Sequence, residues 1–137
     1  MDYKISSNIL NGLLIINIDK DIDDYYFIKL EEVILNQLRD QYVGGVILDY
    51  ANVQVLDYGL VNKMIWLTKS IELMGIKSVV TGLKPEIVIT LISLGFKDLD
   101  IITKLNLAQG VSYIQKQQNT PSPKLKDTTL NERDNIK

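Results

Sequence analysis

The sequence of 137 residues contains neither cysteine nor histidine. Without cysteine the chain has no disulfides, thiolate metal ligands or cysteine nucleophiles, and without histidine it has no Ser-His-Asp triad. The formal net charge is only −2, so we do not expect the broad basic face of a nucleic-acid binder. No apolar run approaches the roughly 20 residues that span a bilayer, and the first residues lack the pattern of a signal peptide. We therefore expect a cytoplasmic protein without nucleic-acid or membrane partners.

Hydrophobic residues make up 46% of the chain, which suits one globular domain with a sizeable core. The composition changes near residue 117, because the remaining sequence is polar, punctuated by proline and poor in apolar residues. Such a composition is typical of disorder. We therefore predict a folded domain over residues 1–116 and a disordered tail over residues 117–137.

The stretch 44–60 is the most informative part of the sequence. Residues 46–48 form a continuous apolar run, which is typical of a strand covered on both faces. Asp49 closes this strand, and Asp57 precedes a long helical pattern whose first N–H groups it can cap. We expect the loop between the two aspartates to be exposed beside a helix N-terminus, a place that suits an anion or a partner surface.

The remaining elements alternate between strands and helices. Asn11-Gly12 lies between two apolar runs and predicts a tight antiparallel hairpin. The expected elements, in order, are strands 5–10 and 13–18, helix 24–39, strand 46–48, helix 60–74, strand 77–81, helix 85–94, a short strand around 101–102 and a helix after Asn106. This order predicts an α/β domain with a mostly parallel sheet of four or five strands, an antiparallel N-terminal hairpin and about four helices.

Four aspartates, at positions 19, 21, 23 and 24, alternate in a way that invites a calcium-loop interpretation. The EF-hand pattern fails, because Asp24 stands where the turn needs glycine and Leu30 stands at the twelfth position. The simpler interpretation is that these acids favour the positive N-terminus of the following helix. Phe27 and Ile34 belong to the apolar face predicted for that helix.

Trp66 lies within the helix that follows the central loop. The favoured interpretation is partial burial against a neighbouring element. An exposed tryptophan would instead indicate an interface with another protein.

In the following helix we predict an apolar face formed by Ile87, Val88, Leu91 and Ile92, with Pro85 at its first position. Thr90 lies in the middle of this helix. A threonine there often donates its hydroxyl to a carbonyl one turn earlier, and we favour that role.

Two signatures stand out in this order of elements. The first is the stretch 49–59, in which one aspartate closes the strand and a second precedes the helix. The second comprises Met74-Gly75-Ile76-Lys77, Thr81-Gly82-Leu83-Lys84-Pro85 and residues 91–95. Together they resemble STAS domains, the fold of anti-sigma-factor antagonists. The chain is most similar to the short single-domain STAS proteins of stressosomes, and residues 13–16 and 106–110 extend the likeness over roughly residues 5–116.

The resemblance implies a STAS-like α/β fold and a binding module in stress signalling, without catalysis and without a cofactor. STAS antagonists bind a serine/threonine switch kinase or an anti-sigma factor, and phosphorylation at the helix start changes the partner. Stressosome members also pack with other STAS proteins into large assemblies. The partner-binding or switch positions that follow for this sequence are Asp49, Asn52, Asp57, Tyr58 and Gly59. Apolar surface on the N-terminal hairpin is the expected contact with other STAS copies or in a homo-oligomer.

The sequence departs from the family pattern at the switch itself. Tyr58 stands where the family has serine or threonine, and Ala51 replaces the serine after the first aspartate. A kinase that positions a small hydroxyl at its γ-phosphate would not accept a phenol, whose oxygen lies several ångströms further out. Three roles are open for Tyr58. Packing of its ring over the helix start is favoured over phosphotyrosine, and the third role is an interface anchor that holds a partner constitutively.

In the resemblance, Thr90 lies near a second regulatory hydroxyl of stressosome STAS domains.

A sensor for a small ligand or nucleotide is the main alternative function. Two helix N-termini, at Asp57 and at Lys84-Pro85, are expected at the same end of the sheet, where open α/β folds bind ligands. Lys84 would then contact the anion. No phosphate-binding glycine loop accompanies these positions. An enzyme with Asp49 and Asp57 as a carboxylate pair is disfavoured, because no base or metal ligand accompanies them and capping explains both.

Overall fold

The computed structural model describes residues 4–96 and 101–119. Its elements are β1 (Ser6–Leu10), β2 (Leu13–Asn17), α1 (Asp24–Asp40), β3 (Gly45–Asp49), α2 (Tyr58–Leu73), β4 (Lys77–Thr81), α3 (Pro85–Ser93), β5 (Ile102–Lys104) and α4 (Leu107–Asn119). The last helix thus continues past residue 116, and the predicted tail from residue 120 onward lies outside the described residues. No helix in the described ranges is long and apolar enough to cross a membrane.

The five strands form one sheet in the order β1-β2-β3-β4-β5. β1 and β2 are antiparallel, and the other neighbouring pairs are parallel. Asn11 and Gly12 form the hairpin turn with φ values of 52° and 78°, which asparagine and glycine tolerate better than other residues. The predicted α/β fold with a largely parallel sheet and an antiparallel N-terminal hairpin is therefore confirmed.

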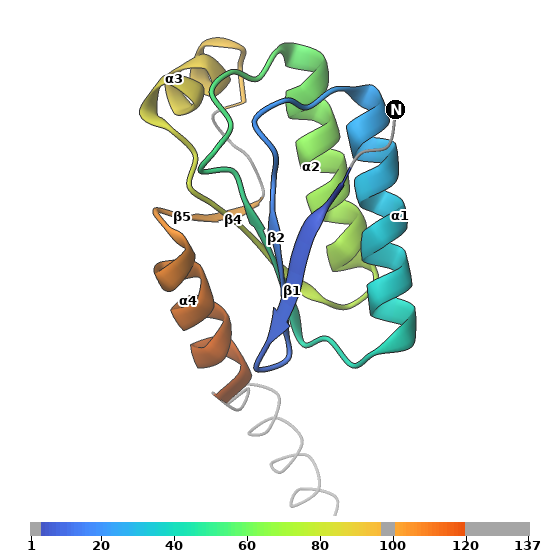
Figure 1. Cartoon of the computed structure of the whole chain (residues 1–137). Helices are drawn as coiled ribbons and strands as arrows, with labels where there is room; N and C mark the ends of the chain where they lie inside the picture. Colours follow the sequence, from blue (N-terminus) through green and yellow to red (C-terminus); the bar gives the residue numbers. More distant parts are fainter. Residues whose placement is uncertain (1–3, 97–100, 120–137) are drawn as a thin grey trace, which may run out of the picture.

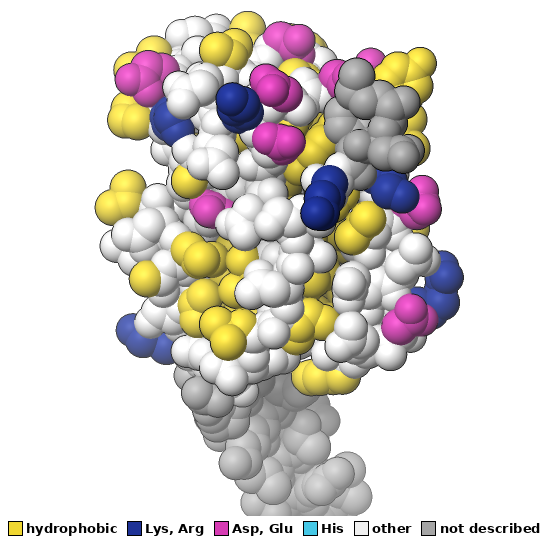
Figure 2. All heavy atoms as spheres, in the orientation of Figure 1, with side chains coloured by type: hydrophobic (Ala, Val, Ile, Leu, Met, Phe, Trp, Pro, Cys, Tyr) yellow, Lys and Arg dark blue, Asp and Glu magenta, His cyan; other side chains and the backbone are white. Residues whose placement is uncertain are grey.

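Helices cover both faces of the sheet, with α1 and α2 on one face and α4 on the other (Figure 1). The larger core cluster joins Leu14 and Ile16 of β2 to apolar residues of α1 and α2, and the smaller one joins Leu13 and Ile15 to Ile114 of α4. β2 is therefore buried on both faces, as a continuous apolar run predicts. Figure 2 shows hydrophobic side chains gathered between α4 and β1 on the face that it presents.

The prediction that Trp66 is partly buried is wrong, because its side chain is 73% exposed. The residues that α2 buries are Val61, Met64, Leu67, Thr68 and Ile71. Their spacing of three and four residues defines one face of the helix, and Trp66 lies on the opposite face.

The apolar face predicted for α3 is only half correct. Ile87 and Leu91 are buried, whereas Val88 and Ile92 are exposed. α3 lies beyond the end of the sheet rather than across a face of it (Figure 1). A helix in that position buries a narrow stripe, so the pair spaced by four residues reaches the core and its neighbours do not.

Candidate functional site

The carboxyl ends of β3 and β4 lie side by side, because Asp49 pairs with Thr81 in the parallel register. Thr81 Oγ1 donates a hydrogen bond of 2.8 Å to Asp49 Oδ1. Gly82 follows with φ of 75°, and a Cβ there would lie 2.6 Å from Asp49 Oδ1 and 2.9 Å from the backbone nitrogen of Ala51. Only glycine therefore allows the two strand ends to approach this closely.

The loop after β3 turns alternately inward and outward. Val53 and Leu56 are buried, whereas Ala51, Asn52 and the other residues between them are exposed. The prediction of an exposed loop thus holds for only part of it, since Tyr50, Val53 and Leu56 anchor the loop in the core. Lys84 Nζ donates a hydrogen bond to the carbonyl oxygen of Ala51 and joins this loop to the start of α3.

We call Asp49, Thr81, Gly82 and Lys84 the base of the site. Their contacts join β3, β4 and the two loops that follow these strands. The ammonium group that was predicted to contact an anion therefore already has a partner, and the anion contact stays a prediction. The sequence identified Asp49 and Lys84, but it gave no sign that Thr81 and Ala51 are their partners.

Asp57 caps α2 as predicted. Its Oδ1 accepts a hydrogen bond of 2.8 Å from the backbone N–H of Leu60, and its extended backbone is typical of an N-cap residue. Asp57, Tyr58 and Gly59 are exposed at the helix start, and Asn52 is exposed on the preceding loop. We call these four residues the rim of the site.

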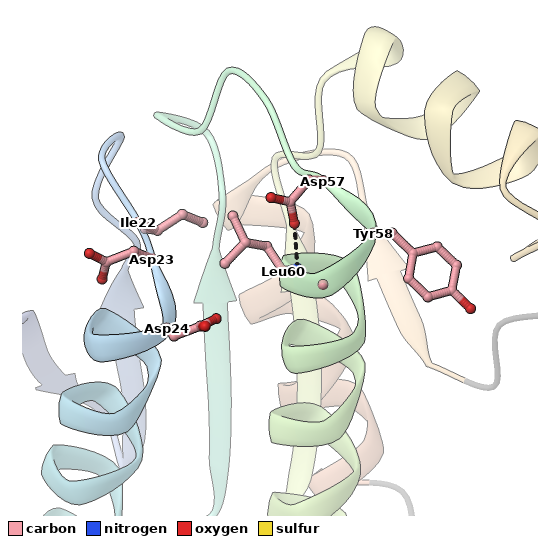
Figure 3. Close-up of a pocket in the computed structure, with 7 residues that line it drawn as sticks. Ile22, Asp23, Asp24, Asp57, Tyr58 and Leu60 are labelled. Carbon is pink, nitrogen blue, oxygen red and sulfur yellow. Dashed lines mark hydrogen bonds between the residues drawn. The ribbon is translucent and has the colours of Figure 1, made fainter.

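Tyr58 is the first residue of α2, and its side chain is 55% exposed. Its ring lies 5.3 Å from the ring of Phe96, measured between centroids, at an interplanar angle of 47°. Figure 3 shows the ring pointing away from α1 and from the side chain of Asp57. The ring thus packs toward the segment after α3 rather than over the helix start, and no sequence pattern indicated Phe96 as its neighbour.

On the other side of the α2 start, a hollow separates the first turns of α1 and α2. Its lining comprises Ile22, Asp23, Asp24, Asp57, Tyr58, Gly59 and Leu60. Ile22 and Leu60 point toward each other between the helix starts, Asp24 and Asp57 extend into the same gap, and Asp23 points away from it (Figure 3). Asp23 Oδ1 accepts from the backbone N–H of Tyr26 at 2.8 Å, which caps α1. Within the described residues, no group of three or more acidic side chains could hold a metal ion.

Two buried tyrosines lie behind the site. Tyr50 directly follows β3 and is fully buried, and its hydroxyl has no hydrogen-bond partner among the described residues. Tyr26 in α1 accepts a hydrogen bond of 2.9 Å from the backbone N–H of Asp19. Burial raises the pKa of both phenols above the usual value of tyrosine. Both rings are therefore neutral packing elements beneath the loops.

Thr90 makes the local bond predicted for it. Its Oγ1 donates to the carbonyl oxygen of Glu86, one turn earlier, at 2.8 Å. The residue is exposed on α3. The hydroxyl is therefore accessible, and its regulatory role stays a prediction.

Comparison with known proteins shows which family this chain resembles. Residues 4–110 match the STAS domain. The RsbT co-antagonist protein RsbRB of Bacillus subtilis (strain 168) is 30% identical over 95 residues, which are 69% of this chain and 34% of that protein. The chain thus spans about a third of the length of the curated relatives that it matches.

Two solved structures share the fold. A variant of RsbS from Moorella thermoacetica superposes with a TM-score of 0.74 at 23% identity, covering 86% of this chain and 100% of that one. The second is a chain of a structure described as the molecular architecture of the stressosome, a signal integration and transduction hub. It gives a TM-score of 0.73 at 23% identity, covering 84% of this chain and 100% of that one. These identities support the fold alone, whereas the match to the STAS domain covers most of the sequence. The chain belongs to the STAS domain family.

Proposed function

We propose that this protein is a non-enzymatic STAS interaction module in stress signalling, a stressosome-type scaffold or an anti-sigma-factor antagonist. The rim of the site would bind a serine/threonine switch kinase or an anti-sigma factor, and other surfaces would contact further STAS domains. The observation that carries the proposal is the exposed Tyr58 ring at the start of α2, beside loops that the base of the site ties together. Tyrosine is a frequent interface anchor because one rigid side chain offers a large contact area.

The aspartates at the site serve structure in this proposal. Asp49 accepts a hydrogen bond from the hydroxyl of Thr81, and Asp57 accepts one from a backbone N–H of α2. Each carboxylate is thus positioned by a hydrogen bond that stabilises the fold. A rigid strand end and a capped helix present the rim in one geometry, which lowers the entropy that a partner must remove on binding.

Tyr58 also sets the mode of regulation that we propose. Its phenol oxygen lies at the far end of a ring that extends toward Phe96. A kinase that acts on serine or threonine would therefore find no hydroxyl close to the helix start. The module would hold its partner constitutively, outside a serine/threonine phosphorylation cycle.

The relatives suggest the class of partner. RsbRB is named for its relation to RsbT, and one structural relative comes from the stressosome. For this chain we propose partners of the same kinds, namely a kinase-like regulator and other STAS proteins.

The test is recovery of native complexes from the host with the tagged full chain, followed by sedimentation. We expect the wild-type chain to recover a regulatory partner and Tyr58→Ala to lose it. Tyr42→Ala is the matched control, because Tyr42 is 85% exposed but precedes β3, at the opposite end of that strand. Equal recovery by both variants would remove the rim from the proposal. If the tagged wild-type chain is recovered with no other protein bound, partner binding is refuted.

A further inference from the structure

The exposed face of α1 and α2 carries large apolar side chains at helical spacing. On α1 the stripe comprises Asp24, Ile28, Glu31 and Leu35, which recur every three or four residues. On α2 the corresponding stripe comprises Gly59, Asn62, Lys63, Trp66 and Leu73. Ile28, Leu35, Trp66 and Leu73 are all exposed. We call these two stripes together the α1–α2 face.

The two stripes border one hollow. Asp24 and Glu31 line it from α1, and Gly59, Asn62, Lys63 and Trp66 line it from α2. Gly59 also lines the hollow at the helix starts, so the α1–α2 face is continuous with the rim. An exposed tryptophan beside a concave surface is the typical centre of a protein interface.

The two sides of this hollow carry opposite charges. The α1 side contributes the carboxylates of Asp24 and Glu31, and the α2 side contributes the ammonium group of Lys63. Lys63 Nζ lies 3.9 Å from Asp24 Oδ1, and the two side chains are 41% and 72% exposed, respectively. A twofold axis along the helices would set the acidic α1 of one copy against the basic α2 of the other. The surface is thus complementary to itself, as an isologous dimer requires.

We propose that the α1–α2 face binds a second copy of this chain through a twofold interface centred on Trp66. This inference rests on the assembly part of the proposed function and not on partner binding at the rim. It also replaces the N-terminal hairpin as the expected contact between copies. Leu10 is the large apolar side chain that the hairpin exposes, whereas Ser6 and Asn8 on the same strand are polar.

The first test is sedimentation equilibrium of the full chain over a wide range of concentrations. We expect a reversible dimer that Trp66→Ala weakens on the order of a hundred-fold, because the substitution enters a twofold interface twice. Ile89→Ala is the matched control, since Ile89 is 64% exposed on α3, away from this face, and should leave the dimer unchanged. A chain that stays monomeric, or a dimer indifferent to Trp66→Ala, would overturn the proposal.

The second test exchanges charges across the interface. Lys63→Glu alone, and Glu31→Lys alone, should each weaken the dimer, because each brings like charges together in both halves. A mixture of the two variants should restore it, since every contact between the two different copies again joins opposite charges. Thermal melts of both variants check that each remains folded. If the mixture forms a dimer no tighter than the dimer of either variant by itself, the twofold arrangement is contradicted.

Tyr58→Ala separates this inference from the proposed function. The variant should lose the regulatory partner but retain the dimer, because Tyr58 points away from α1 (Figure 3). Loss of the dimer in this variant would place the self-contact at the rim and overturn the inference. A dimer that persists while the wild-type chain recovers no partner would refute partner binding and leave the inference standing.

Discussion

The base and the rim of the site are neighbours in space, but they are held in different ways. In the base, side chains from β3 and β4 contact each other across two strands, and Thr81 is fully buried. In the rim, Asp57 accepts a hydrogen bond from the backbone of its own helix, α2, and Tyr58 exposes more than half of its surface. A prominent residue of a signature can therefore hold the fold together instead of facing solvent. Asp49 joins two strands, whereas Tyr58 leaves much of its ring exposed at the start of α2.

The comparison predicts that changes in the base lower the free energy of unfolding, whereas changes in the rim alter binding. Gly82→Ala should have the largest effect, about 2–3 kcal/mol, because it combines a positive φ with a clash against the backbone of Ala51. Urea denaturation measures the loss. Gly59→Ala is the matched control, since a Cβ there makes only an ordinary contact of 3.5 Å with Asp57 Oδ1. A similar loss in both variants would show that the base is no tighter than the rim.

Asp49→Ala tests the polar contact that holds the base together. The substitution leaves the buried hydroxyl of Thr81 without its acceptor, and we expect a loss of about 1–2 kcal/mol in the free energy of unfolding. Combining it with Thr81→Val removes both partners and should recover part of that loss. Strictly additive losses in the double variant would mean that the two side chains do not interact.

The caps of α1 and α2 offer a matched pair for the rim. Asp57→Ala and Asp23→Ala each remove a carboxylate that accepts a backbone N–H at 2.8 Å. Each should cost about 1 kcal/mol of stability in urea denaturation. Only Asp57→Ala should also weaken partner recovery, because only Asp57 belongs to the rim. Equal effects on partner recovery would extend the binding surface to the start of α1.

Local signals in the sequence predicted the fold well. The Asn11-Gly12 turn, the Asp57 cap and the glycine that ends α2 each depend on neighbouring residues, and all three are present. Glycine at position 75 has φ of 82°, and Ile76 donates its N–H to Ile71 in the pattern that closes a helix.

Contacts between residues far apart in the chain could not be predicted from the sequence. Asp49 and Thr81 are 32 positions apart, and Lys84 and Ala51 are 33 apart. No periodicity links such residues before the strands are placed in register. Trp66 is different, because its position opposite the buried stripe of α2 could have been read from helical spacing alone.

Tyr58→Phe should have the smallest effect and the most specific meaning. The substitution keeps the ring that packs on Phe96 and removes only an exposed hydroxyl, so stability should change by less than about 0.5 kcal/mol. If the ring anchors a partner, Tyr58→Phe should recover that partner as well as the wild-type chain does. A phosphotyrosine switch would instead be abolished, because no oxygen remains to accept phosphate. Measuring partner recovery of Tyr58→Phe beside Tyr58→Ala therefore assigns the role of the rim to the ring or to its hydroxyl.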